Sequence, residues 1–372
     1  MQALIDEYLN EAREDGVQIN GVTPQVISGR GIGMVATREL EKDEAIMTIP
    51  TESIRSLHTI PHDISMKLSP DMSIHGLLAA EVALRNNASQ VWSQIIPTWE
   101  DFQNTIPLLW PEALQELLPT EAKSILIKQT GRYEADWEAF QIGFPKQDRQ
   151  GYLYAWFLVG TRTFFFDSPE MTLYPWHDRL SLLPVADLFN HSATGCQVSF
   201  RDEGYTITTD RHYDAGEEIF TSYGDHSNDF LLAEYGFVLG KNQWDKVCLD
   251  DLIIPKLSAT QISALKENGY WGDFMLHSGS EKSDAIFIAL RVLCCDVFNW
   301  QKFVDGDEDK GGSLAKGIAL LPELLNEYRD KIAVVKSKVR ELSEGNESQK
   351  TLLWDRWEQI ETIVEGLVET QW

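Results

Sequence analysis

The chain has 372 residues, of which 43% are hydrophobic, and its formal net charge is −26 at pH 7. The hydrophobic content excludes a disordered chain. The negative charge argues against nucleic acid and anionic membranes as partners and favours a basic protein, although it also fits a role in solubility alone. The four cysteines form no C-x-x-C pair, which is typical of a reducing compartment. We therefore expect a soluble, monomeric protein of the cytoplasm, the nucleus or both.

The first half of the chain alternates between helical and β-like patterns. Residues 1–15 are predicted to form a helix with one apolar face, and residues 20–50 contain short β-like segments separated by turns. The pattern then becomes helical to about residue 160. A helix that begins near Thr120 is expected to end at Gly131, and residues 148–166 are predicted to form one long aromatic helix.

The β pattern returns in the second half of the chain. Two alternating runs at 197–208 predict a hairpin, and a turn and strand are expected at 214–224. After about residue 245 the chain is predicted to be mostly helical, with amphipathic helices at 321–342 and 351–369. The predicted domain limits are 1–19 for an N-terminal helix, 20–60 and 156–240 for two β-rich halves, 61–155 for a helical insertion, and 241–372 for a helical C-terminal domain.

The stretch GRGIGMVA contains the pattern G-x-G-x-x-A at Gly31, Gly33 and Ala36. A dinucleotide-binding turn needs an apolar strand before the glycines and a helix after them. Here Pro24 interrupts the upstream segment, and a charged turn and a β-like run follow downstream. The context therefore argues against a dinucleotide fold. A plain hairpin turn, in which glycine supplies a positive φ, fits the same residues.

Three later segments carry further polar and aromatic residues: LVGTRTF at 158–164, LLPVADLFNHSATG at 182–195 and IFTSYGDHSNDFLLAEYGFVL at 219–239. Taken singly, each fits an ordinary helix end, cap or turn. Other chemistries fit less well, because the His and Cys spacing is wrong for zinc and no phosphate-binding P-loop is present. We therefore expect no metal site.

Together and in this order, the four segments resemble the SET-domain methyltransferases. They are most similar to the branch that contains Rubisco large-subunit methyltransferase, its relatives acting on ribosomal and other non-histone proteins, and the actin-histidine methyltransferase. The resemblance implies an α+β fold with a small all-β SET core and a knot-like crossing at the NHS segment. It also implies a helical insertion inside the SET domain and an all-α C-terminal domain that binds the substrate. The implied cofactor is S-adenosylmethionine.

The resemblance also assigns roles to residues at matching positions. Arg162 would meet the cofactor carboxylate, Asn190 and His191 would hold its amino group and adenine, and Phe237 would pack on the adenine. The full set implied for cofactor binding is Arg30, Gly31, Ile32, Gly33, Arg162, Asn190, His191 and Phe237. Tyr223 matches the catalytic tyrosine that orients the acceptor amine. With Phe164 and Tyr235 it would line the substrate channel.

The resemblance favours lysine as the acceptor. Phe164 stands two residues after Arg162, as in lysine enzymes, where the actin-histidine branch has a polar amide. The acidic composition favours a basic, Lys-rich substrate protein. Two alternatives remain open from the sequence. One is a catalytically idle SET-fold protein that binds a basic partner, and the other is a methyltransferase acting on histidine or on a non-protein amine.

Overall fold

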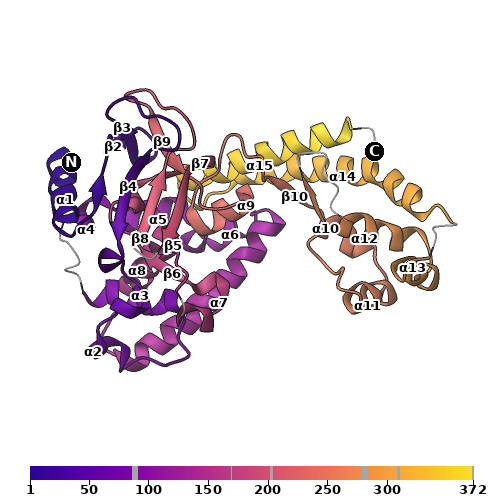
Figure 1. The fold of residues 1–372 in the computed structure, drawn as a ribbon. Coiled ribbons are helices and arrows are strands. Elements are labelled where there is room, and N and C mark those ends of the chain that lie inside the picture. Colours follow the sequence, from indigo (N-terminus) through magenta and orange to yellow (C-terminus); the bar gives the residue numbers. More distant parts are fainter. Residues whose placement is uncertain (86–90, 169, 202–203, 278–283, 308–310, 371–372) are drawn as a thin grey trace. The chain divides into compact units, whose positions relative to one another are not determined.

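The computed structural model describes the whole chain except residues 86–90, 169, 202–203, 278–283, 308–310 and 371–372 (Figure 1). The chain forms two compact units. The first unit contains residues 1–102 and 128–225, and the second contains residues 103–127 and 226–372. Within the described residues, no helix is both long and apolar enough to cross a membrane.

A mixed seven-stranded sheet forms the centre of the first unit, with the strand order β1-β4-β8-β7-β9-β3-β2. The strands are β1 (Gln18–Ile19), β2 (Val22–Ile27), β3 (Gly31–Ala36), β4 (Ala45–Pro50), β7 (Asn190–Arg201), β8 (Gly204–Thr208) and β9 (Glu218–Thr221). The predicted hairpin is confirmed, because Gln197 of β7 lies opposite Thr208 of β8. The three later strands, β8, β7 and β9, lie in the middle of the sheet between the earlier ones: β4 pairs with β8, and β3 pairs with β9. The sheet therefore joins segments that are more than 150 residues apart in the sequence.

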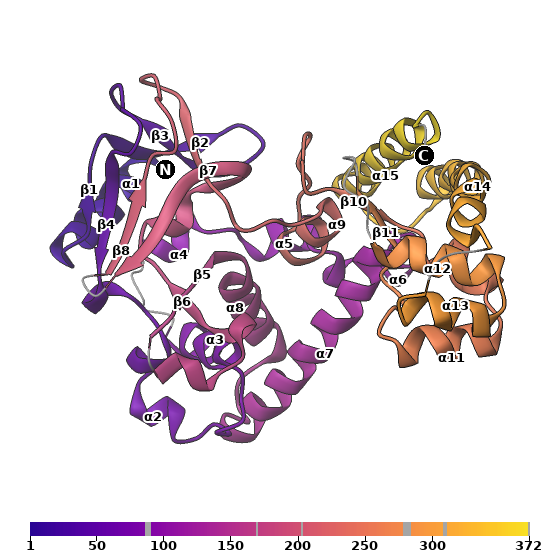
Figure 2. The same cartoon turned by 45° about the vertical axis from the view of Figure 1, so that its right-hand side comes forward.

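Helices and a small second sheet complete the first unit. The predicted N-terminal helix is confirmed as α1 (Gln2–Glu14). The other elements are α2 (His62–Ser65), α3 (Ile74–Leu84), α4 (Trp92–Ile95), α5 (Trp99–Thr105), α7 (Thr120–Gly143), α8 (Arg149–Arg162), β5 (Thr163–Phe165) and β6 (Leu180–Leu182), with 3-10 turns at Thr51–Ser53, Leu57–Thr59, Glu170–Leu173, Trp176–Asp178 and Ala186–Leu188. Residues 103–105 of α5 and residues 120–127 of α7 belong to the second unit. In both views α3 runs beside α8 (Figures 1 and 2).

The helical insertion corrects two sequence predictions. Helix α7 passes through Gly131 and ends at Gly143, because its aromatic side chains pack beyond that glycine. For example, Phe140 of α7 stacks on Tyr152 of α8 with ring centroids 4.2 Å apart. This burial outweighs the cost of about 1 kcal/mol for an exposed helical glycine. The second correction concerns α8, which ends at Arg162, after which Thr163–Phe165 form β5 opposite β6.

The second unit is mostly helical. Its elements are α6 (Glu112–Gln115), α9 (Asn228–Phe230), a π-helical turn (Leu231–Tyr235), β10 (Lys246–Cys248), α10 (Asp250–Ile253), α11 (Ala259–Glu267), β11 (Met275–His277), α12 (Asp284–Cys294), α13 (Val297–Val304), α14 (Ser313–Glu341) and α15 (Glu347–Val368), with 3-10 turns at Pro107–Leu109 and Ile254–Lys256. Two strands, β10 and β11, form an antiparallel pair that the all-α expectation for residues 241–372 left out.

The two longest helices of the second unit begin earlier than the helices predicted at 321–342 and 351–369. Helix α14 begins at Ser313, before the predicted start at Leu321, and contains Pro322. The earlier start is possible because Gly317 has no side chain where α14 meets α12. A Cβ there would lie 3.1 Å from the Leu290 carbonyl carbon. Apolar residues of both helices, including Leu325, Ile332, Leu353 and Val364, share one buried core.

Candidate functional site

The glycine turn of the first unit connects β2 and β3, where Ile27 lies opposite Gly31. Gly31 has a φ of 72°, a conformation that glycine adopts without steric cost. Gly33 has a different reason to lack a side chain. A Cβ at Gly33 would lie 2.6 Å from both Asn190 Nδ2 and Glu218 Oε1. The turn is therefore a hairpin connection, and no helix follows it as a dinucleotide fold would require.

Asn190 begins β7, which runs parallel to β9 with Asn190 opposite Phe220. Its side-chain amide donates to Glu218 Oε1 at 2.8 Å. The other oxygen of Glu218 pairs with Arg30 Nη2 at 2.5 Å, and the Arg30 guanidinium lies 5.5 Å from the centre of the Phe220 ring. The structure thus brings together three residues of the predicted cofactor set, Arg30, Gly33 and Asn190, around Glu218. Ile32, another member of that set, lies in β3 opposite Val26.

Arg162 and Asp187 form a second polar group in the first unit. Arg162 Nη1 donates to the Asp187 carbonyl oxygen at 2.8 Å and to Asp187 Oδ2 at 3.1 Å. Trp92 Nε1 also donates to Asp187 Oδ2, at 2.8 Å. The Asp187 side chain is only 3% exposed, yet its Oδ1 has no hydrogen-bond partner among the described residues, and neither has Arg162 Nε. A buried unbonded donor and acceptor are costly, so this pair is suited to bind a polar ligand.

A cavity of about 450 Å³ lies beside Asp187, and its lining includes Tyr8, Arg55 and Trp92. The backbone near it is strained, because Val185 has a φ of 67°, which a β-branched residue rarely adopts. The Val185 N–H donates to the buried Tyr8 hydroxyl at 3.2 Å, so α1 supports this conformation. Strain of this kind tends to be retained where it places functional groups, and here it precedes the turn that carries Asp187.

His191 and Tyr223 lie side by side, with ring centroids 4.9 Å apart. The Tyr223 backbone N–H donates to His191 Nδ1 at 3.0 Å, which requires that nitrogen to be unprotonated. The Tyr223 hydroxyl donates to the Phe189 carbonyl oxygen at 2.6 Å. Burial raises the pKa of Tyr223 to about 12, with a smaller increase from Asp187 and an opposing effect of Arg162. The hydroxyl therefore stays neutral at physiological pH.

The remaining predicted residues are aromatic and lie in different places. Phe164 is in β5 opposite Ser181, and its ring centroid is 6.5 Å from that of Tyr205. Tyr235 and Phe237 belong to the second unit, where their ring centroids are 6.2 Å apart on either side of Gly236. The part of the chain that the structure describes has no group of three His, Cys, Asp or Glu that could hold a metal ion.

Sequence reasoning missed Glu218 and Trp92 and assigned no role to Asp187. Glu218 and Trp92 have no local pattern that links them to the glycine turn or to Arg162. Asp187 had a signal, because it stands three residues before Asn190 in the same segment, ADLFNH. Its partnership with Arg162 depends on the end of α8 meeting the turn at Ala186–Leu188, which a single sequence does not reveal.

Comparison with known proteins identifies the kind of domain. A family model described as SET domain matches residues 31–224, just over half of the chain. The chain is similar to the ribosomal lysine N-methyltransferase set11 of Schizosaccharomyces pombe, at 26% identity over 341 residues that cover 86% of each chain.

Two solved structures share the fold. The SET domain of LSMT bound to lysine and AdoHcy gives a TM-score of 0.63 at 17% identity, covering 98% of this chain and 91% of the other. Rubisco LSMT bound to AdoMet gives a TM-score of 0.61 at 17% identity, covering 98% and 92%. The predicted α+β fold, with a β-rich core, a helical insertion and long C-terminal helices, is confirmed.

Proposed function

Because the chain belongs to the SET-domain family, we propose that it is a protein-lysine N-methyltransferase that uses S-adenosyl-L-methionine. The single observation that carries the proposal is the grouping of Arg162, Asp187, His191 and Tyr223 in one unit, where the charges of Arg162 and Asp187 act on Tyr223. Arg162 and Asp187 each have a buried polar atom without a hydrogen-bond partner among the described residues. The similarity to a relative named as a ribosomal lysine N-methyltransferase supports the same activity. Non-histone proteins are the proposed substrates.

The residues of the first unit fit this cofactor. Its amino-acid end carries an ammonium and a carboxylate. Asp187 Oδ1 and Arg162 Nε, which have no hydrogen-bond partner within the described part of the chain, are an acceptor and a donor for such groups. The main chain of Arg30, Gly31 and Ile32 and the side chain of Asn190 are proposed to bind the same molecule, and Phe237 to pack on its adenine. When bound, the cofactor supplies an electrophilic methyl group on a positively charged sulfur.

Tyr223 is proposed to orient the lysine amine. Its hydroxyl already donates to the Phe189 carbonyl, so its oxygen can accept a hydrogen bond from the amine. Lysine must be neutral to react, although its ordinary pKa is about 10.4. Burial in a channel formed by Phe164, Tyr223 and Tyr235 would lower the pKa of the amine, and so would a nearby positive charge. Tyr223 then acts by alignment and not as a base, since its own pKa of about 12 keeps it protonated.

Finer assignments belong to the same proposal. We propose a basic, Lys-rich substrate protein, because of the net charge of −26, and substrate binding by residues 241–372. Lysine is preferred to histidine because Phe164 follows Arg162 by two residues. The domain limits, the knot-like crossing, the monomeric state and the location in the cytoplasm or nucleus stay predictions.

The test combines cofactor binding and methyl transfer. Calorimetry with S-adenosyl-L-methionine is followed by transfer of labelled methyl groups to fractions of basic protein extracts. We expect Tyr223→Phe to bind the cofactor but to lose about 100-fold or more in turnover, because the lysine amine is no longer aligned. Tyr152→Phe makes the same chemical change in buried helix α8 and is expected to retain turnover. Cofactor binding without transfer to any fraction would instead support the idle SET-fold protein that binds a basic partner.

A further inference from the structure

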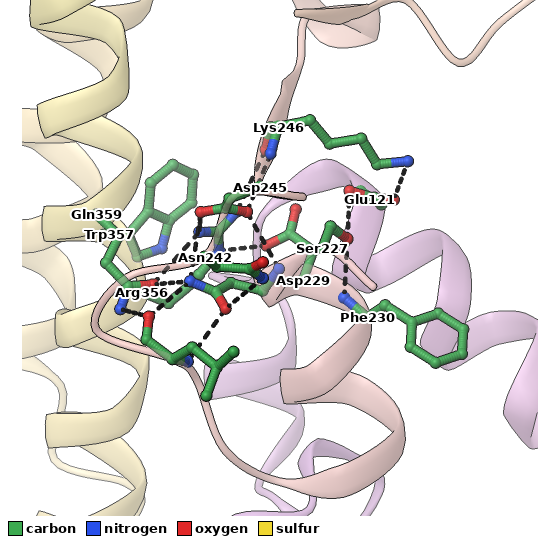
Figure 3. A network of polar contacts seen from close by, with 12 residues as sticks. Glu121, Ser227, Asp229, Phe230, Asn242, Asp245, Lys246, Arg356, Trp357 and Gln359 are labelled. Atoms are coloured by element: carbon green, nitrogen blue, oxygen red, sulfur yellow. Dashed lines mark hydrogen bonds and ion pairs between the residues drawn. The ribbon is translucent and has the colours of Figure 1, made fainter. Parts of the chain in front are cut away.

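Arg356 lies on α15 in the second unit and is completely buried, with 0% of its surface exposed. Its Nε donates to Asp229 Oδ1 at 2.6 Å, and its Nη1 donates to Asp245 Oδ2 at 2.7 Å (Figure 3). Its Nη2 reaches the carbonyl oxygen of Lys246 at 3.4 Å. One buried cation therefore joins the C-terminal helix to two carboxylates more than 100 residues earlier in the chain.

The same network ties together the two ends of the segment 228–239. The Asn228 side-chain amide donates to the Leu239 carbonyl oxygen at 3.0 Å, and the Leu239 N–H donates to Asn228 Oδ1 at 3.1 Å. Asp245 Oδ1 accepts from the Asn228 N–H at 3.1 Å. On α15, Gln359 accepts a hydrogen bond from the Asn228 side-chain amide and donates one to the Leu239 carbonyl oxygen. The base of this loop is thus held by two side chains of α15.

The loop between these ends carries Tyr235 and Phe237. A π-helical turn leads to Gly236, which has a φ of 78° and reverses the chain between the two rings. A Cβ at Gly236 would lie 2.8 Å from Thr105 Cβ and Oγ1, so the turn has no room for a side chain. With so little freedom inside the loop, the positions of the two rings depend on how its base is held.

We infer that Arg356 is a positioning residue for Tyr235 and Phe237. The inference rests on the proposed function, which places Phe237 on the adenine and Tyr235 in the channel. A planar guanidinium that must meet two carboxylates holds the segments that carry those carboxylates in one arrangement. Lysine has the same charge but is a single point donor, so it cannot reproduce the forked contact with Asp229 and Asp245.

The experiment uses the full-length protein and compares Arg356→Lys with Leu325→Ala. Leu325, on α14, is also 0% exposed. It lies in the apolar core that α14 and α15 share, but it is not part of the Arg356 network. Hydrogen exchange is measured without cofactor, and the Kd for S-adenosyl-L-methionine by calorimetry. For Arg356→Lys we expect faster exchange at residues 226–239 and a Kd raised about tenfold, and a lower kcat even at saturating cofactor, because Tyr235 lines the proposed channel. Leu325→Ala is expected to lower stability without either local effect.

Unchanged exchange at 226–239 in Arg356→Lys would overturn the inference, and so would an equal rise in Kd for Leu325→Ala. If Arg356→Lys does not fold, Asp229→Asn is used instead, because it removes only the charge of one carboxylate that Arg356 contacts. This variant must then show the same faster exchange at residues 226–239. Failure of the wild-type protein to bind the cofactor would contradict the proposed function instead. The exchange comparison would still decide whether Arg356 fixes the loop.

Discussion

Arg162 in the first unit and Arg356 in the second both form ion pairs with buried aspartates. The two sites differ in whether buried polar atoms are left without a hydrogen bond. Among the described residues, Arg162 Nε and Asp187 Oδ1 have no hydrogen-bond partner. Around Arg356, by contrast, Nε, Nη1 and Nη2 each donate to an oxygen of the second unit. An unbonded buried polar atom costs about 1–3 kcal/mol, so it is expected where a ligand completes it. A saturated network instead holds segments in one arrangement.

The largest effect on stability is expected from Arg356→Ala. Removing the cation leaves Asp229 and Asp245 buried without their partner, so the free energy of unfolding should fall by about 3–5 kcal/mol. Urea unfolding followed by circular dichroism measures the change. Replacing all three residues with neutral ones, as Arg356→Met, Asp229→Asn and Asp245→Asn, should restore much of the loss. A loss below about 1 kcal/mol in Arg356→Ala would show that the network is not a structural clamp.

Asp187→Asn should leave the stability almost unchanged and weaken cofactor binding, in contrast to Arg356→Ala. The amide keeps an oxygen for Trp92 and Arg162, so we expect the free energy of unfolding to change by less than about 1 kcal/mol. The lost carboxylate charge should raise the Kd for S-adenosyl-L-methionine about tenfold or more. Calorimetry and urea unfolding on the same preparation separate the two effects. A large loss of stability with unchanged affinity would make Asp187 a structural residue like Asp229.

The smallest expected effect is on the pH dependence of kcat. Burial raises the pKa of Tyr223 to about 12 from an ordinary value of 10.0, so the neutral phenol persists to higher pH than in a free tyrosine. We therefore expect kcat to rise with pH as the lysine amine loses its proton, and not to fall between pH 8 and pH 10. The Asp187 charge contributes to the raised pKa of Tyr223, so Asp187→Asn should lower it. A pH profile of kcat for both proteins measures this. A decline centred below pH 10 in the wild type would contradict the account.

Local patterns in the sequence were sufficient for much of the fold. The spacing of apolar residues predicted α1, and the polar turn predicted the β7–β8 hairpin. The prediction that a helix ends at Gly131 was wrong, because the packing of Phe140 on Tyr152, which supports the longer helix, cannot be recognised from a local pattern. The motifs predicted Arg162, Asn190, His191 and Tyr223, which the structure places in one unit.

Contacts between residues that are far apart in the chain could not be predicted from the sequence. Asp229 and Arg356 are 127 residues apart, and each looks like an ordinary surface charge in its own helix. Trp92 and Asp187 are 95 residues apart and meet only because the insertion returns to the core. In both cases the physical signal is the burial of a charge, and burial becomes visible only once the chain is folded.

We propose that the protein moves a methyl group from S-adenosyl-L-methionine to a lysine. The most direct measurement is tandem mass spectrometry of the methyl-labelled acceptor, formed by the wild-type protein and absent with Tyr223→Phe. We expect the label on a lysine side chain. Label on a histidine or on a non-protein amine would contradict it.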